Sequence, residues 1–228
     1  MKKAAILISG HVRDFERTLP QLTALVDYVD GDVFIASYDR RAVGVRFWQG
    51  QEHSNDTLIE TDYIQIEQAL QPKKTVFSES VNIPEKLKDY SFKNKLVNIE
   101  GVYKMFYKVW ESNQLKMQYE STHNFKYDMV IRTRFDNEYL HVDFSKFNPE
   151  LILTARSDHR AYMTDTFFVA GTDRMNRICE IVKHIGTELP TQQYYNAEHM
   201  LTAFCTSMKV PILANGDIKI KLRDKLFT

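Results

Sequence analysis

Short apolar runs alternate with longer amphipathic segments along most of this chain, and this order limits the fold more than any other feature. The first run, residues 3–9, is followed by helical spacing over 14–28 and by a second apolar run at 32–37. Helical spacing returns at 57–70, and a short strand is predicted at 75–77. Strands that alternate with helices predict a largely parallel sheet that helices cover on both faces.

The same order continues through the second half of the chain. The longest helical pattern, residues 98–119, carries a broad apolar stripe that indicates core packing. Further strands are predicted after a charged strand near residue 130, at 151–154, 166–170 and 211–214, and further helices at 172–185 and 192–205. No Pro-, Gly- or Ser-rich linker interrupts the chain, so we expect one α/β domain over residues 1–228 with a mixed, mostly parallel sheet.

Charge and cysteine usage narrow the function class. Lysine plus arginine and aspartate plus glutamate are equal at 30 each, so the chain lacks the global basic field that drives nucleic-acid binding. Cys179 and Cys205 lie in apolar segments without metal-ligand spacing, which predicts buried thiols in a reducing compartment. The apolar run at 4–8 is too short for a secretion signal or a membrane span, and we expect a cytoplasmic protein.

A cluster of charges closes a strand in the middle of the chain. Residues 127–138 read YDMVIRTRFDNE, and a strand with period two sends Arg132 and Arg134 to the same side. Asp136 and Glu138 follow just past the carboxyl end, the edge where open α/β sheets bind ligands. A carboxylate pair with D-x-E spacing can hold a hard divalent cation on oxygen ligands, and arginines can bind phosphate oxygens at two points. An ion-pair network that only closes the strand is the alternative.

Two earlier strand ends also carry polar residues. Gly10 and Arg13 lie at the first strand-to-helix turn, where glycine allows close backbone approach and a helix N terminus presents N–H groups to an anion. Ser37 and Asp39 end the second strand and are candidates to contact the base or ribose of a nucleotide. An ordinary tight turn at Gly10 and a loop cap at Asp39 are the alternatives. Residues 40–56 lack periodicity, which favours a mobile substrate loop or a surface excursion.

Three residues in the last third of the chain are candidates for acid–base or ligand chemistry. Asp165 begins a strongly apolar strand, where a carboxylate can orient or deprotonate an acceptor hydroxyl. Glu198 and His199 are consecutive near a helix start, and their side chains diverge by about 100° around the helix axis. Glu198 is therefore a candidate base and His199 a separate candidate metal or phosphate ligand. A strand-entry turn and structural roles on the helix are the alternatives.

Taken in order, these segments resemble the small nucleotide-sugar glycosyltransferases of the GT-A fold found in polysaccharide and lipopolysaccharide loci and in large DNA viruses. The resemblance rests on the first strand with Gly10-His11-Val12-Arg13, the strand at 32–35, and the Arg-x-Arg-x-Asp segment at 132–136. It implies a single Rossmann-like GT-A catalytic domain that moves a sugar from a nucleotide-diphosphate donor, with UDP-sugar favoured, to a glycan acceptor. In this family an aspartate motif holds Mn²⁺ or Mg²⁺ against the donor diphosphate.

The resemblance also implies roles for single residues. Asp136 takes the metal role with Glu138 as the second acidic position, although Asp136-Asn137-Glu138 departs from the usual Asp-x-Asp. On this basis Asp136→Ala is expected to abolish turnover and leave the fold intact. The positions that the family places near phosphate or sugar are Arg13, Arg132 and Arg134. Those near the reacting sugar are Asp165 and Glu198.

Two other functions fit parts of the same pattern. A sugar-nucleotidyltransferase uses a similar sheet and metal, but its glycine-rich, basic N-terminal signature is missing from this sequence. A nonenzymatic nucleotide- or glycan-binding module is the second alternative, with a structural Arg/Asp cluster. Donor binding without turnover distinguishes the module from the transferase.

Overall fold

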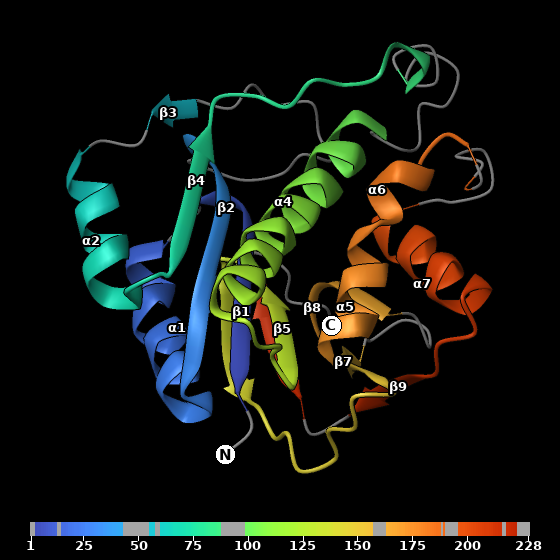
Figure 1. The fold of residues 1–228 in the computed structure, drawn as a ribbon. Coiled ribbons are helices and arrows are strands. Elements are labelled where there is room, and N and C mark those ends of the chain that lie inside the picture. Colours follow the sequence, from blue (N-terminus) through green and yellow to red (C-terminus); the bar gives the residue numbers. More distant parts are fainter. Residues whose placement is uncertain are drawn as a thin grey trace.

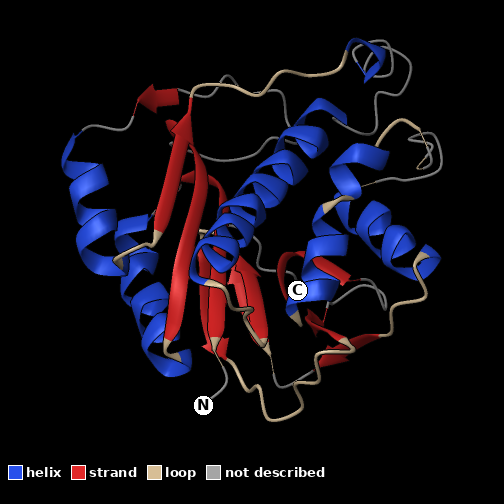
Figure 2. Ribbon diagram, viewed as in Figure 1, coloured by secondary structure: helices blue, strands red, loops and turns tan. Residues whose placement is uncertain are grey.

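The computed structural model describes residues 3–12, 15–42, 55–57, 60–87, 99–156, 163–187, 189, 196–215 and 218–222. Among these residues, eight strands form one mixed sheet and helices lie on both of its faces (Figure 1). Figure 2 shows the same view with the strands in red between helices on either side. The α/β class predicted from the sequence is confirmed.

The strands of the large sheet alternate with helices along the chain. These strands are β1 (Ala4–Val12), β2 (Gly31–Ala42), β3 (Asn55–Thr57), β4 (Lys74–Ser78), β5 (Met129–Thr133), β7 (Ile152–Arg156), β8 (Met163–Ala170) and β9 (Ile212–Asn215). The helices are α1 (Phe15–Val29), α2 (Glu60–Leu70), α4 (Ile99–His123), α5 (Thr172–Cys179), α6 (Ile181–His184) and α7 (Ala197–Ser207). Strands β6 (Asn137–His141) and β10 (Lys219–Leu222) pair antiparallel in a second, small sheet.

Strand directions are mostly parallel, as predicted. The order across the large sheet is β3-β2-β1-β5-β8-β7-β9, and β4 also pairs with β2. Strand β1 runs parallel to both β2 and β5, and the pairs β2–β4 and β7–β9 are parallel as well. Strand β8 runs antiparallel to its neighbours β5 and β7, and β3 runs antiparallel to β2.

The order of strands reverses at β1. From β1 the chain passes through α1 to β2 and later to β4, on one side of β1. It then crosses through α4 to β5, on the other side of β1, and α1 and α4 cover opposite faces (Figure 1). The gap between β1 and β5 is therefore the topological switch point, and the carboxyl ends of these strands form the edge where such sheets bind ligands.

Alternating side chains divide the core into two layers. Leu7 and Val130 belong to the cluster that packs under α4, α5 and α7, whereas Ile6 and Ile131 belong to the cluster under α1 and α2. Each of the four is fully buried. This arrangement follows from the period of two along a strand whose two faces are both covered.

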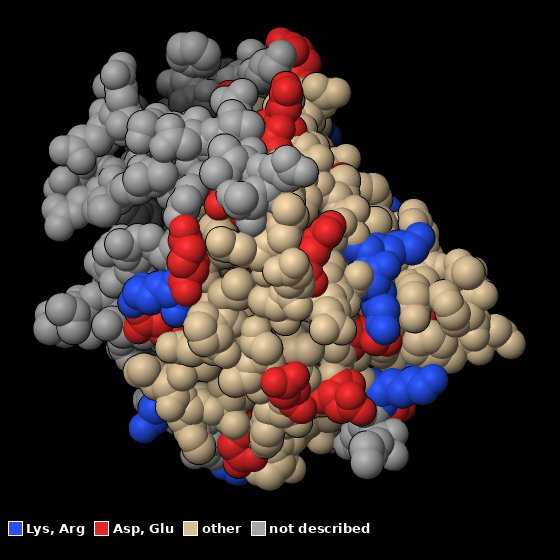
Figure 3. All heavy atoms as spheres, turned by 90° about the vertical axis from the view of Figure 1, so that its left-hand side faces the viewer, with Lys and Arg blue, Asp and Glu red and all other residues tan. Residues whose placement is uncertain are grey.

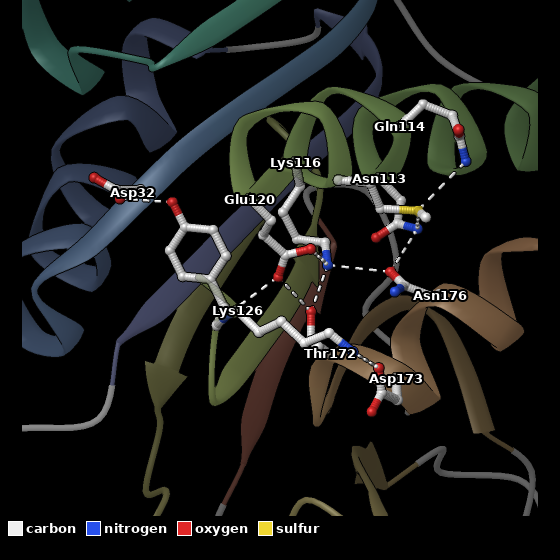
Figure 4. Close-up of polar contacts among 11 residues, drawn as sticks. Asp32, Asn113, Gln114, Lys116, Glu120, Lys126, Thr172, Asp173 and Asn176 are labelled. Atoms are coloured by element: carbon white, nitrogen blue, oxygen red, sulfur yellow. Dashed lines mark hydrogen bonds and ion pairs between the residues drawn. The ribbon is translucent and has the colours of Figure 1, made fainter. Parts of the chain in front are cut away.

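A buried polar network ties α4 to the turn between β8 and α5 (Figure 4). Lys116 Nζ donates to Glu120 Oε2 at 3.0 Å and to Asn176 Oδ1 at 3.1 Å, and it also donates to the Thr172 hydroxyl. Glu120 Oε1 accepts from the Tyr127 amide at 3.0 Å. The network satisfies a lysine that the apolar stripe of α4 buries completely, and it fixes α4 against α5.

Several element boundaries differ from the sequence predictions. The helix predicted at 57–70 begins only at Glu60, because residues 55–57 form β3 beside the end of β2. The helix predicted at 172–185 divides at Glu180 into α5 and α6. Within the predicted loop at 40–56, residues 40–42 and 55–57 are paired strands, and residues 43–54 lie outside the described residues.

Two simpler expectations concern burial. Cys179 and Cys205 are free and buried, as predicted. Among the described residues, no helix is long and apolar enough to cross a membrane.

Candidate functional site

Most of the predicted site residues come to one edge of the sheet. That edge joins the carboxyl ends of β2, β1 and β5 to the beginning of β8, and these four strands are consecutive in the sheet. It carries Gly10, Ser37, Asp39, Arg132, Arg134, Asp136 and Asp165. Arg13 lies outside the described residues. Among the described residues, strand ends that are far apart in the sequence thus meet at one edge of the sheet.

Gly10 and Ser37 contact each other at the ends of β1 and β2. Gly10 has a φ of +113°, a backbone conformation that side chains with a Cβ rarely adopt. The Ser37 hydroxyl donates to the Gly10 carbonyl at 2.5 Å, and the register between the two strands shifts directly after this pair. Glycine therefore permits the irregular end of β1, and the hydrogen bond from the Ser37 hydroxyl stabilises it.

Arg132 is a fully buried cation inside an apolar layer. It pairs with Leu7 of β1 and Phe168 of β8, and all three side chains face α4. Its Nη1 donates to the Asp165 carbonyl, but Nε and Nη2 have no partner among the described residues. Burial lowers the pKa of Arg132 to about 10, against the opposing effect of the Asp165 charge. The guanidinium is therefore still charged at neutral pH.

Ser9 is a second buried polar group on the same side of the switch point. Along β1, Leu7 and Ser9 project to the face covered by α4, as Arg132 does from β5. Ser9 is fully buried, and its hydroxyl has no hydrogen-bond partner among the described residues. A buried hydroxyl and a buried guanidinium edge, both unpartnered, thus lie on adjacent strands.

Arg134 and Asp136 form a two-point ion pair directly beyond β5. Arg134 Nε donates to Asp136 Oδ1 at 2.8 Å, and Nη2 donates to Oδ2 at 2.6 Å. The side chains are 20% and 10% exposed, so the pair lies nearer the solvent than Arg132. The charge of Arg134 is close enough to lower the pKa of Arg132, although burial has the larger effect. Two like charges are therefore neighbours here.

Glu138 belongs to β6, a strand that the sequence patterns did not predict. Its carboxylate forms an ion pair with Arg17 of α1. Between the two acids, buried Asn137 donates to the Thr133 hydroxyl at 2.9 Å and to the Thr166 carbonyl at 3.0 Å. Asn137 was not predicted as a site residue, yet its hydrogen bonds hold the start of β6 directly after the turn at residues 135–136.

The arrangement of the predicted metal ligands does not fit a divalent cation held by these residues as they stand. Both oxygens of Asp136 accept hydrogen bonds from Arg134, and Glu138 pairs with a different arginine. His199 lies on α7, where its backbone N–H is capped by the Asn196 side chain at 2.8 Å. Among the described residues, no three His, Cys, Asp or Glu side chains are grouped as metal ligands. A requirement for Mn²⁺ or Mg²⁺ stays a prediction.

The two candidate bases lie on adjacent elements. Asp165 is half-buried near the start of β8, and its carbonyl contacts Arg132. Helix α7 packs against the start of β8, where the Met163 amide donates to the Thr202 hydroxyl at 3.0 Å. Glu198 lies in the first turn of α7, with its Oε2 3.5 Å from the Asn196 amide nitrogen. The structure therefore brings Asp165, rather than Glu198, into contact with the arginine cluster.

Asp39 faces the opposite side of the sheet from Arg132. Its Oδ1 is buried without a hydrogen-bond partner among the described residues. After burial, the Asp39 charge is the next contribution that raises the pKa of Tyr63 on α2. The Asp39 side chain therefore lies on the face of the sheet covered by α2, whereas the Arg132 side chain lies on the face covered by α4.

The sequence patterns also missed a polar group beside the site. Lys108 of α4 is fully buried and donates to Ser78 Oγ at 2.7 Å and to Glu111 Oε2 at 2.6 Å. Its Nζ lies 5.1 Å from the ring centroid of Tyr38, which stacks on His11 at 4.6 Å. The available signal was a lysine within the apolar stripe of α4.

The face of the molecule that carries α1 and α2 has a mixed charge (Figure 3). Acidic and basic side chains are scattered between uncharged ones on the described part of this face. This distribution agrees with the equal numbers of acidic and basic residues in the chain. It gives no electrostatic support to nucleic-acid binding there.

No protein-family model matches this chain, and no curated protein sequence matches it significantly.

Proposed function

We propose that this protein is a glycosyltransferase of the GT-A type, which transfers a sugar from a nucleotide-diphosphate donor to a hydroxyl of a glycan acceptor. The observation that carries the proposal is the Nε/Nη2 edge of Arg132 at the switch point of the sheet, which has no hydrogen-bond partner among the described residues. A buried cation without a matching anion is costly, and a phosphate oxygen supplies the missing partner. The switch point is also where α/β sheets bind nucleotides.

The proposed reaction is a substitution at the anomeric carbon of the donor sugar. The bond between that carbon and the diphosphate oxygen breaks, and its electron pair leaves with the nucleotide diphosphate. A bond forms between the same carbon and the acceptor oxygen, and the acceptor proton passes to a carboxylate. Arg132 would stabilise the charge that develops on the leaving diphosphate.

Asp165 is the better placed of the two candidate bases. Its backbone carbonyl accepts from Arg132, and its charge raises the pKa of that guanidinium against the larger effect of burial. A carboxylate at this position would lie at the same edge of the sheet as the leaving diphosphate, where it can accept the proton of an acceptor hydroxyl bound there. Glu198 is the second candidate, on the helix that packs over the start of β8.

The nucleotide and the metal are predicted rather than specified by the described residues. UDP is the favoured nucleotide, and Mn²⁺ or Mg²⁺ is the expected cation from the family resemblance.

The test is release of the free nucleotide from a panel of donor sugars, with a mixture of oligosaccharide acceptors: a diphosphate from UDP-, GDP- and dTDP-sugars, and CMP from CMP-sugars. We expect one donor class to be consumed by the wild-type protein and Asp165→Asn to lose at least about 100-fold of that rate. Thr164→Val, directly next to Asp165 in the chain, is not a suitable control, because the Thr164 hydroxyl contacts Thr166. Lys126→Met on the exposed surface serves instead. Binding of a donor without turnover would favour a nonenzymatic binding module.

A further inference from the structure

The two arginines at the end of β5 differ in how their donors are used. The Nε and Nη2 groups of Arg134 donate hydrogen bonds to the two carboxylate oxygens of Asp136. Arg132 presents the same kind of edge without a partner among the described residues, and only its Nη1 is engaged, by the Asp165 carbonyl. This edge of a guanidinium matches the two oxygens of a carboxylate or phosphate.

Three further features point to an oxyanion rather than to a neutral ligand. The Ser9 hydroxyl, also buried and unpartnered, lies on the adjacent strand and on the same face. Arg134 and Arg132 are close enough for one charge to lower the pKa of the other, so an anion beside them relieves repulsion. The layer around Arg132 is apolar, which strengthens charge-assisted hydrogen bonds.

We propose that Arg132, with Ser9, binds a phosphate oxyanion without a divalent cation. This inference deepens the proposed function, since the oxyanion is then the donor diphosphate. It differs from the metal expectation because Arg134 already occupies both oxygens of Asp136, so that a cation must displace Arg134 to bind there. Arginine supplies the positive charge that a divalent ion supplies in other phosphate sites.

Asp136 therefore has a different role from a metal ligand. The Asp136 carboxylate forms an ion pair with Arg134, so the Nε/Nη2 edge of Arg134 is not available to the anion. Removing the charge of Asp136 makes the Nε/Nη2 edge of Arg134 available to the anion, next to that of Arg132.

The experiment is isothermal titration of the full chain with inorganic pyrophosphate in EDTA, and with UDP in EDTA or in MnCl₂. We expect both probes to bind in EDTA. Arg132→Lys, which keeps the charge but loses the two-point edge, should weaken binding by at least about 10-fold. Asp136→Asn should bind pyrophosphate as tightly as the wild type or more tightly. The matched control is Arg174→Met. It removes an arginine of α5 that pairs with Glu150, and the variant should bind normally.

The other outcomes separate this inference from the proposed function. UDP binding only in MnCl₂, with loss in Asp136→Asn, overturns the inference and leaves the glycosyltransferase proposal standing. Pyrophosphate binding in EDTA without binding of any nucleotide supports the oxyanion site and counts against the glycosyltransferase. Failure of the wild type to bind either probe in either buffer overturns the inference, and the glycosyltransferase proposal is overturned as well only if GDP, CMP and dTDP also fail to bind. Thermal unfolding of each variant confirms that it is folded. The comparison of EDTA with MnCl₂ uses the wild type alone, so it tests the inference even if a variant fails to fold.

Discussion

Arg134 holds Asp136 at two points, with Nε 2.8 Å from Oδ1 and Nη2 2.6 Å from Oδ2. The consequence for stability is asymmetric, because the arginine is 20% exposed and the aspartate only 10%. Removing the aspartate charge leaves a guanidinium that water reaches, whereas removing the arginine leaves a mostly buried carboxylate.

Asp136→Asn should therefore lower the free energy of unfolding by about 1–2 kcal/mol, and Arg134→Met by more. Urea unfolding of both variants at neutral pH measures the difference. Glu150→Gln is the control, since Glu150 is 71% exposed in its ion pair with Arg174 and should change stability by less than about 1 kcal/mol. A larger loss in Asp136→Asn than in Arg134→Met would contradict this view of the pair.

Replacing Lys116 by methionine should strongly destabilise the fold. The change leaves Glu120 buried without its cation, and breaking a buried ion pair from one side costs about 3–5 kcal/mol. Lys126→Met is matched to it, because Lys126 pairs with Asp173 nearby in Figure 4 but both side chains are exposed. We expect that control to stay within about 1 kcal/mol of the wild type in guanidinium unfolding. Equal losses in the two variants would show that the network does not stabilise α4.

Two glycines with positive φ should respond differently to alanine. At Gly10, φ is +113° and an added Cβ would meet no atom of the described residues within 4 Å, so Gly10→Ala should cost only backbone strain, about 1–3 kcal/mol. At Gly186, φ is +77° and an added Cβ would lie 2.4 Å from Leu87 Cδ2. Gly186→Ala adds a clash to the strain and should lower the midpoint of thermal unfolding further. The opposite order of midpoints would be evidence against these two backbone conformations.

Thiol reactivity should report the burial of the two cysteines. Burial raises the pKa of Cys179 and of Cys205 from 9.0 to about 12, and the thiolate is the reactive form. Both should react with a disulfide reagent at pH 8 only after unfolding. Because each folded pKa is above the unfolded value, the thiols' contribution to stability is complete below pH 9.0 and is lost as pH rises toward 12.

The comparison for that pH dependence is the double variant Cys179→Ala/Cys205→Ala. Its stability should fall less steeply than that of the wild type between pH 9.0 and about 12. Rapid labelling of the folded wild type at pH 8 would mean that the cysteines are accessible.

The alternation of apolar runs was enough to predict the α/β class and a mostly parallel sheet. This succeeded because parallel strands buried on both faces are apolar along their whole length and so stand out in a sequence. The direction of β8 and the existence of β6 were not predictable in this way. Both depend on which strand pairs with which, and period two is the same for either direction.

The sequence indicated which charged residues lie at the candidate site, but not which of them pair with each other. Arg132 and Arg134 have the same spacing and the same face, and nothing in the sequence indicates that one binds Asp136 while the other keeps a free edge. That difference arises because the turn held by Asn137 directs Asp136 toward Arg134 and Glu138 toward Arg17. Tertiary hydrogen bonds across 29 residues, from Asn137 to Thr166, set that turn.

The most direct measurement for the central claim is the affinity of the wild type and of Arg132→Met for UDP, GDP, CMP and dTDP by isothermal titration. We predict that one nucleotide class binds the wild type selectively. Its affinity should fall at least about 10-fold in folded Arg132→Met and not in Arg174→Met. Equal affinity in the wild type and Arg132→Met would contradict the assignment of the nucleotide site to the switch point between β1 and β5.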